Sequence, residues 1–330
     1  MLVKSGRSSG RFQEPFNEKI ASVLCSRLLD EGDYVAYELE DGGFMKWTSR
    51  CKPMTDQVTE FVPAWALLCS SKRPSDLGLH DFYVSACAAH GLDVRENVEK
   101  MLTIDYLMAN FDRHWNNFGV LIDSESREWL RAAPVFDTGE ALWCDRELSQ
   151  PFDGYTTPRA GMMRPFARKI DEQLGRYCRD LSWFDPSGLK GFSEEACDIL
   201  LGNPFIANER GRIDKIREAI DLRAMMLTRH AHEISGGRGF MVPDMGAVCA
   251  TGAAKRTGRP SVIPKNRASC PHIGMKRFPI GKKGYKLRPA GHTVVGIPPS
   301  PASHRKGLSM GKYEIRRRGT SPSSSTATTP

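Results

Sequence analysis

The chain has 330 residues, 40% of them hydrophobic, and its net charge of +8 combines an acidic body (−8 over residues 1–235) with a basic tail (+16 over residues 236–330). An apolar run of about 18 residues and a signal-peptide pattern are both missing, which excludes a membrane span and a secretory signal. Nine scattered cysteines without a Cys-x-x-Cys pair argue against a disulfide framework and a zinc site, so the sequence predicts a cytoplasmic protein.

The first 62 residues predict a small lobe of strands and one helix. Extended segments are indicated at residues 1–5, 33–40, 43–49 and 59–63. Residues 14–29 have apolar side chains at the 3.6-residue spacing that is typical of an amphipathic helix. Asp41-Gly42-Gly43 is a hairpin turn that joins two of the strands.

Residues 63–235 predict a second, mainly helical lobe. Helical spacing is present at residues 79–90, 94–110, 194–201 and 212–233. One part differs, because residues 118–123 and 129–136 read as two strands joined by a polar turn. From residue 236 onward Gly, Pro, Ser and basic residues dominate. Such a composition cannot bury enough apolar surface to fold, so residues 236–330 are predicted to be a disordered tail.

Polar side chains with complementary chemistry gather around the predicted hairpin. Asp112 and Asn117 precede its outgoing strand, and Asp137 follows its returning strand. Because a hairpin brings its ends together, Asn117 and Asp137 should converge, and their oxygen atoms are the ligands that a hard divalent cation prefers. Phosphoryl transfer needs such a set: one carboxylate to accept the hydroxyl proton, and an Asn and an Asp to hold the metal on the phosphates. Each piece taken alone also fits an ordinary loop or turn.

The ordered combination is more specific than its parts. Asp-Arg-His-x-x-Asn (residues 112–117), a short hairpin and Ala-Pro-x-Phe-Asp-x-Gly (residues 133–139) resemble the catalytic and metal segments of HipA-like kinases. The phosphatidylinositol 3- and 4-kinases have a more distantly similar arrangement. The resemblance covers about residues 1–233 and implies an α+β, two-lobed protein-kinase-like fold that uses ATP and Mg²⁺ to phosphorylate Ser or Thr of a protein. It implies that Asp112 is the base, and that His114 supports the catalytic loop or assists transfer.

The same resemblance assigns roles in the small lobe. Leu-Val-Lys-Ser-Gly and Gln-Glu-Pro-Phe-Asn-Glu place Lys4 and Glu18 where a kinase has the strand lysine that holds the α- and β-phosphates and the helix glutamate that orients it. Residues 59–63 lie where a hinge would contact adenine through the backbone of Glu60 and Val62. An ordinary linker strand fits that segment equally well.

The start of the chain departs from the kinase pattern. A complete small lobe has two strands and a glycine-rich loop before the lysine, whereas three residues precede Lys4 here. The segment Gly6–Gly10 follows the lysine and does not read Gly-x-Gly-x-x-Gly. Either this family member functions without that hairpin or its N-terminal lobe is truncated. We expect truncation, which puts ATP affinity and catalysis in doubt.

Two alternative functions stay open at this point. The chain could be a catalytically inactive ATP-binding or scaffold homologue, as the missing loop would favour. It could also be a nucleic-acid-associated protein whose tail binds phosphates through basic clusters such as Arg316–Arg318. HipA-like proteins include toxins of toxin–antitoxin pairs, so the resemblance also implies a small antitoxin-like DNA-binding partner.

Overall fold

The computed structural model describes residues 1–6, 11–43, 47–152, 165–236 and 314–315. All of them belong to one unit, formed by Met1–Asp244 and Gly311–Pro330. The small lobe contains β1 (Leu2–Ser5), α1 (Glu14–Leu28), β2 (Tyr37–Asp41), β3 (Trp47–Cys51) and β4 (Thr59–Pro63). The helical lobe contains α2 (Ala64–Ser70), α3 (Leu79–Ala89), α4 (Arg95–Met108), β5 (Gly119–Asp123), β6 (Trp129–Ala132), α5 (Ile170–Tyr177), the 3-10 helix η1 (Pro186–Leu189), α6 (Phe192–Leu201), α7 (Pro204–Ala207) and α8 (Arg210–Ile234). A two-residue strand, β7 (Glu314–Ile315), completes the described elements.

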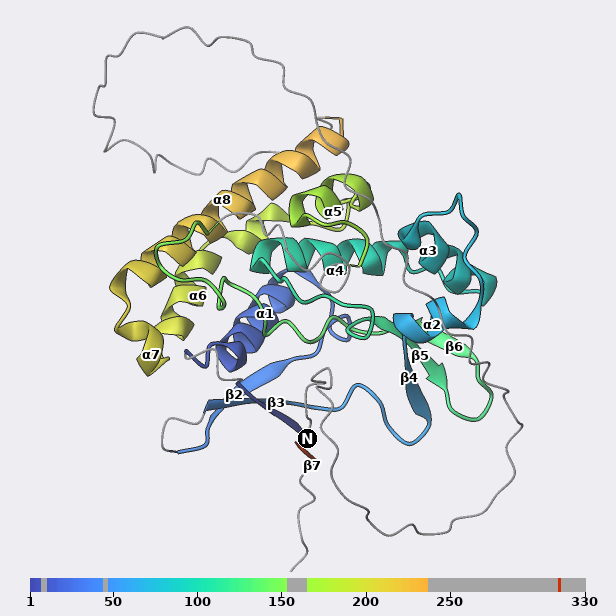
Figure 1. The fold of residues 1–330 in the computed structure, drawn as a ribbon, viewed down its shortest axis with the longest axis horizontal. Coiled ribbons are helices and arrows are strands. Elements are labelled where there is room, and N and C mark those ends of the chain that lie inside the picture. The colour runs from blue at the N-terminus through green and yellow to red at the C-terminus, as the bar shows by residue number, and fades with distance from the viewer. Residues whose placement is uncertain (7–10, 44–46, 153–164, 237–313, 316–330) are drawn as a thin grey trace, which may run out of the picture. The chain divides into compact units, whose positions relative to one another are not determined.

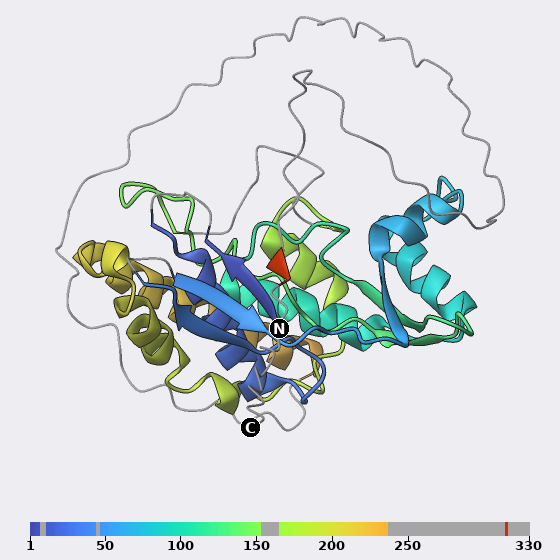
Figure 2. The same ribbon diagram turned by 90° about the horizontal axis from the view of Figure 1, so that it is seen from below.

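Helix α1 lies between the first sheet and the helical lobe (Figures 1 and 2). The sheet is antiparallel, with strand order β2-β3-β1-β7. α1 contacts β1, β2 and β3 on one side and α4, α6 and η1 on the other. Phe16, Ile20 and Leu24 are therefore fully buried. Pro15 lies in the first turn, where its missing N–H costs no helical hydrogen bond.

Helix α4 is the central helix of the second lobe and contacts α1, α5 and α8 (Figure 1). Every residue from Val98 to Met108 is buried, so the helix is covered on all sides rather than along one stripe. α4 ends at Ala109, whose left-handed backbone (φ +49°) is unusual for a residue other than glycine. That turn directs the chain into the loop that carries Asp112.

The second sheet has the order β4-β5-β6 and contains the predicted hairpin. Its edge strand is β4, the segment expected to be the hinge. β4 and β5 pack closely at Gly119: a Cβ there would lie 2.1 Å from the Val62 carbonyl oxygen. Only glycine fits this contact without a shift of the backbone.

Several boundaries differ from the sequence prediction for tertiary reasons. β2 begins at Tyr37 rather than at residue 33 because Asp33–Val35 leave the first sheet and exchange backbone hydrogen bonds with Val135. β6 ends at Ala132, short of Pro134. None of the described helices combines the length and the apolar character needed to cross a membrane.

Most of the predicted tail lies outside the described residues. Within residues 236–330 the structure describes Gly236 and β7. β7 pairs antiparallel with β1, with Leu2 opposite Ile315 and Val3 opposite Glu314. The prediction of a disordered tail is therefore wrong for β7. For the rest of residues 237–330, which lie outside the described residues, it stays a prediction.

Candidate active site

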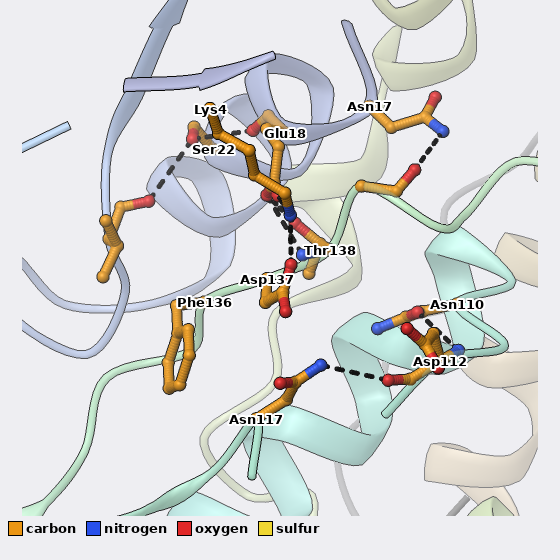
Figure 3. Close-up of polar contacts among 12 residues, drawn as sticks. Lys4, Asn17, Glu18, Ser22, Asn110, Asp112, Asn117, Phe136, Asp137 and Thr138 are labelled. Carbon is orange, nitrogen blue, oxygen red and sulfur yellow. Dashed lines mark hydrogen bonds and ion pairs between the residues drawn. The ribbon is translucent and has the colours of Figure 1, made fainter. Parts of the chain in front are cut away.

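Lys4 and Glu18 come together as the sequence predicted. Lys4 lies on β1 and Glu18 on α1, and the Lys4 ammonium donates to Glu18 Oε1 at 2.6 Å (Figure 3). The Glu18 carboxylate is fully buried, whereas Lys4 keeps 22% of its side chain exposed. Lys4 also forms an ion pair with Asp137, which follows the hairpin. β1, α1 and the distant turn after the hairpin thus meet at one ammonium group.

Glu18 also fixes the turn that carries Asp137. Its second oxygen, Oε2, accepts hydrogen bonds from the Thr138 backbone N–H at 3.0 Å and from the Thr138 hydroxyl at 2.8 Å. Asp137 itself has a left-handed backbone with φ +55°. One buried carboxylate therefore aligns both Lys4 and the turn that carries Asp137 (Figure 3).

A second connection joins α1 to the same turn. The side-chain amide of Asn17, which is buried, donates to the carbonyl oxygens of Gly139 at 2.7 Å and Ala141 at 2.8 Å. Asn17 and Thr138 were not assigned roles from the sequence. The signal for Asn17 was its position one residue before Glu18, one and two helical turns before the apolar residues Ile20 and Leu24.

The loop after α4 holds Asp112 and Asn117 in a fixed relation. The Asp112 backbone N–H donates to the side-chain oxygen of Asn110 at 3.1 Å, and the Asn117 side-chain amide donates to the Asp112 carbonyl at 3.1 Å (Figure 3). His114 lies between them in the sequence, and its backbone N–H donates to the Asp112 carbonyl at 2.8 Å. The Asp112 side chain is partly exposed, as a group that must reach a substrate requires.

Arg113 is the main residue of the site that the sequence analysis left without a role. Its side chain is 1% exposed and forms two hydrogen bonds with Asp105, a buried acid on α4. The same guanidinium donates to the carbonyl oxygens of Asn117 and Phe136. An acidic residue near the end of an apolar helix, eight positions before an arginine, was the available signal.

The electrostatics of the site follow from these contacts. Burial alone would raise the pKa of the Asp137 carboxyl, but the Lys4 ammonium, with smaller effects from Arg113 and His114, holds this pKa below its ordinary value. Burial alone would lower the pKa of Lys4, but Glu18 and Asp137 raise it well above its ordinary value. Asp137 is therefore a carboxylate and Lys4 an ammonium at neutral pH.

The donor atoms at the hairpin end fit a magnesium ion held together with a nucleotide. Asn117 uses its amide nitrogen on the Asp112 carbonyl, which leaves its amide oxygen for a cation. The carboxylate of Asp137 supplies hard oxygen donors. Mg²⁺ is commonly bound through one or two such side chains and completes its octahedron with phosphate oxygens and water. The residues present match that pattern.

The expected adenine contacts at Glu60 and Val62 need a correction. Two backbone hydrogen bonds frame β4, from Ser124 N–H to the Val58 carbonyl and from Ala64 N–H to the Phe118 carbonyl, both at 2.9 Å. Hydrogen bonding alternates along an antiparallel ladder, so the peptide groups of Glu60 and Val62 point toward β5. These peptide groups are therefore not available to an adenine at the open edge of the sheet.

Phe61, rather than Glu60 or Val62, has backbone groups that point outward from the sheet. Its N–H and C=O point to the open edge of β4, as does the ring nitrogen of Pro63, which has no proton to donate. The Phe61 ring packs edge-on against Phe136, with ring centroids 5.5 Å apart. Phe61 therefore links the expected hinge to the residue just before Asp137.

Comparison with known proteins finds similarity among solved structures. No protein-family model and no curated protein matches the sequence. Among solved structures the chain is similar to the proinflammatory kinase CtkA of Helicobacter pylori, with a TM-score of 0.52 and 18% sequence identity over 71% of this chain and 90% of that chain. At this identity the likeness shows the fold alone. It confirms the predicted α+β, kinase-like architecture.

Proposed function

We propose that the chain is an ATP- and Mg²⁺-dependent kinase that phosphorylates a Ser or Thr hydroxyl of a protein, as HipA-like kinases do. The observation that carries the proposal is the meeting of Lys4, Glu18 and Asp137 from three elements of a kinase-like fold. A pair of surface charges would satisfy itself with solvent. A strand lysine held between a fully buried helix acid and a loop acid is the arrangement that a kinase uses to hold phosphates together with a metal ion.

Each side chain then has a defined task. Lys4 binds the α- and β-phosphates and Glu18 orients it, while Asn117 and Asp137 hold Mg²⁺, which neutralises the charge on the phosphates when bound. Asp112 orients the acceptor hydroxyl and accepts its proton as the new P–O bond forms and the bond to the ADP oxygen breaks. Phe61 contacts adenine through its outward N–H and C=O. His114 supports the loop that holds Asp112.

The test compares nucleotide binding with phosphoryl transfer in the full chain. Asp112→Asn keeps the shape and hydrogen bonding of Asp112 but removes the proton acceptor. We expect it to bind ATP normally and to transfer labelled phosphate from ATP about 10²–10⁴-fold more slowly than the wild type. Asp137→Ala should lose Mg²⁺-dependent ATP binding and keep its fold.

The same measurements separate the alternatives. A wild-type chain that binds Mg²⁺ and ATP but transfers no phosphate to itself or to a general protein acceptor is the inactive homologue. A chain that binds no ATP removes the kinase proposal. If Asp112→Asn lowers ATP affinity as much as Asp137→Ala does, Asp112 is a metal ligand and not the base. The antitoxin-like partner and nucleic-acid binding by residues 236–330 remain predictions.

A further inference from the structure

Arg113 follows the proposed base Asp112, yet its side chain turns away from solvent. It is among the largest fully buried side chains of the described residues. A buried arginine needs partners for its N–H groups, because each buried donor left without one is costly. The identity of those partners shows what Arg113 does.

The partners flank both proposed metal ligands. Arg113 Nη1 donates to the carbonyl oxygen of Asn117 itself at 2.8 Å and to the carbonyl of Phe136, the residue before Asp137. On its other side the guanidinium is held by Asp105, with Nε and Nη2 each 2.9 Å from a carboxylate oxygen. Asp105 is in turn held by the Asn110 side-chain amide at 2.8 Å.

We propose that Arg113 is a positioning residue that sets the spacing between Asn117 and Asp137, and thereby the affinity of the site for the nucleotide-bound metal ion. The inference rests on the proposed function, because it takes Asn117 and Asp137 as metal ligands. Asn117 and Asp137 lie on different segments, and the Arg113 guanidinium is bonded to both segments at once. The planar guanidinium donates to three groups in fixed directions, whereas the ammonium of a lysine is a compact charge that cannot hold all three groups at these positions. Groups behind a metal ligand commonly change metal affinity by about 10–100-fold when removed.

A matched control is present elsewhere in the chain. Arg212 at the start of α8 is fully buried and has partners of the same kinds: the Glu209 carboxylate at 2.7 Å and the carbonyls of Trp143 and Arg146. None of these residues belongs to the proposed site. Arg113→Lys and Arg212→Lys therefore remove similar hydrogen bonds from similar surroundings.

The experiment uses the full chain and measures ATP binding by calorimetry at increasing Mn²⁺, with a metal-free series as reference and thermal unfolding as a check on folding. We expect Arg113→Lys to raise the half-saturating Mn²⁺ concentration about 10–100-fold and to leave metal-free ATP binding close to that of the wild type. Arg212→Lys should shift the Mn²⁺ requirement less than about threefold, although it lowers the unfolding temperature comparably.

Equal shifts in the two variants would show that Arg113 has only a structural role. If Arg113→Lys does not fold, Asp105→Asn decides: it leaves Arg113 in place but weakens its hold, and an unchanged Mn²⁺ requirement overturns the proposal. If the wild type binds ATP in a metal-dependent way and Arg113→Lys has the same Mn²⁺ requirement, the inference about Arg113 is wrong but the proposed function stands. A wild-type chain with no such binding removes the proposed function and the inference together.

Discussion

At the residue scale, Lys4 constrains the candidate site most. Its ammonium is bonded to one oxygen of Asp137, a proposed metal ligand. Glu18 is engaged on both oxygens, by Lys4 on one and by Thr138 on the other. A cation that binds Asp137 without a nucleotide would therefore be repelled by the Lys4 ammonium and would compete with it for the carboxylate charge. In the proposed function, ATP would relieve this competition by giving Lys4 its phosphates as alternative partners.

Lys4→Met should raise the affinity for Mn²⁺ alone and lower the affinity for ATP. A hydrogen bond to a charged group contributes about 1.5–3 kcal/mol, so losing the competing ammonium should strengthen Mn²⁺ binding by about tenfold or more. Titration with Mn²⁺ followed by electron spin resonance measures the first effect, and calorimetry with ATP measures the second. Lys19→Met is the control, because Lys19 lies on α1 and pairs with Glu38 of β2 rather than with Asp137. If Lys4→Met binds Mn²⁺ no better than the control, Lys4 does not compete with the metal.

At the element scale, the features that could be predicted from sequence are those whose signal is local. α1, α4 and the β5–β6 hairpin have their own periodicity and turn residues, so their positions were expected to within a few residues. The convergence of Asn117 and Asp137 follows from the hairpin alone. Lys4 and Glu18 were assigned through the family resemblance, since one lysine and one glutamate carry no pattern of their own.

Other features depend on partners that the sequence does not reveal. The register of β4 with β5 decides which backbone N–H and C=O groups of β4 point away from the sheet. A shift of one residue would make these the groups of Glu60 and Val62 instead of those of Phe61. The role of Arg113 depends on Asp105 and on two backbone carbonyl groups. Because every residue has a backbone carbonyl, the sequence cannot show which of them accept hydrogen bonds from Arg113. Asp33–Val35 were predicted as part of a strand but form only an isolated bridge, because their partner Val135 lies about a hundred residues away.

The packing of β4 on β5 leads to a prediction about Gly119. In Gly119→Ala the new Cβ would lie 2.1 Å from the Val62 carbonyl oxygen and 2.9 Å from the Pro63 Cα, both backbone atoms that cannot rotate away. We expect a loss of about 1–3 kcal/mol in the free energy of unfolding, measured with urea, and weaker ATP binding as β4 shifts. Gly175→Ala is the control: it lies within α5 with no heavy atom near its would-be Cβ, so it should gain about 0.5–1 kcal/mol. Equal stability of the two variants would mean that β4 and β5 are not packed this closely.

At the scale of the whole molecule, the pairing of β7 with β1 joins the basic tail to the acidic body within the described residues. β1 carries Lys4, so this contact bears on the site. A few strand hydrogen bonds contribute about 0.5–1.5 kcal/mol each. For the disordered segment that the sequence predicts between α8 and β7, on the order of 80 residues, chain closure costs about 4 kcal/mol. The two terms nearly cancel, so the pairing adds little to the stability of the small lobe.

A chain that ends at Gly236 should therefore keep the function of the full chain. We expect its affinity for Mg²⁺ and ATP and its rate of phosphoryl transfer to stay within about threefold of the full-length values, because near-cancellation leaves less than about 1 kcal/mol for β7 to contribute. Limited trypsin digestion of the full chain should remove the region after Gly236 first, since its composition predicts exposed Lys and Arg in unstructured backbone. A more than tenfold loss of ATP affinity in the shortened chain would mean that β7 contributes more than this estimate allows. Restored affinity on adding a peptide of residues 311–318 would then identify the strand as the missing edge of the nucleotide-binding lobe.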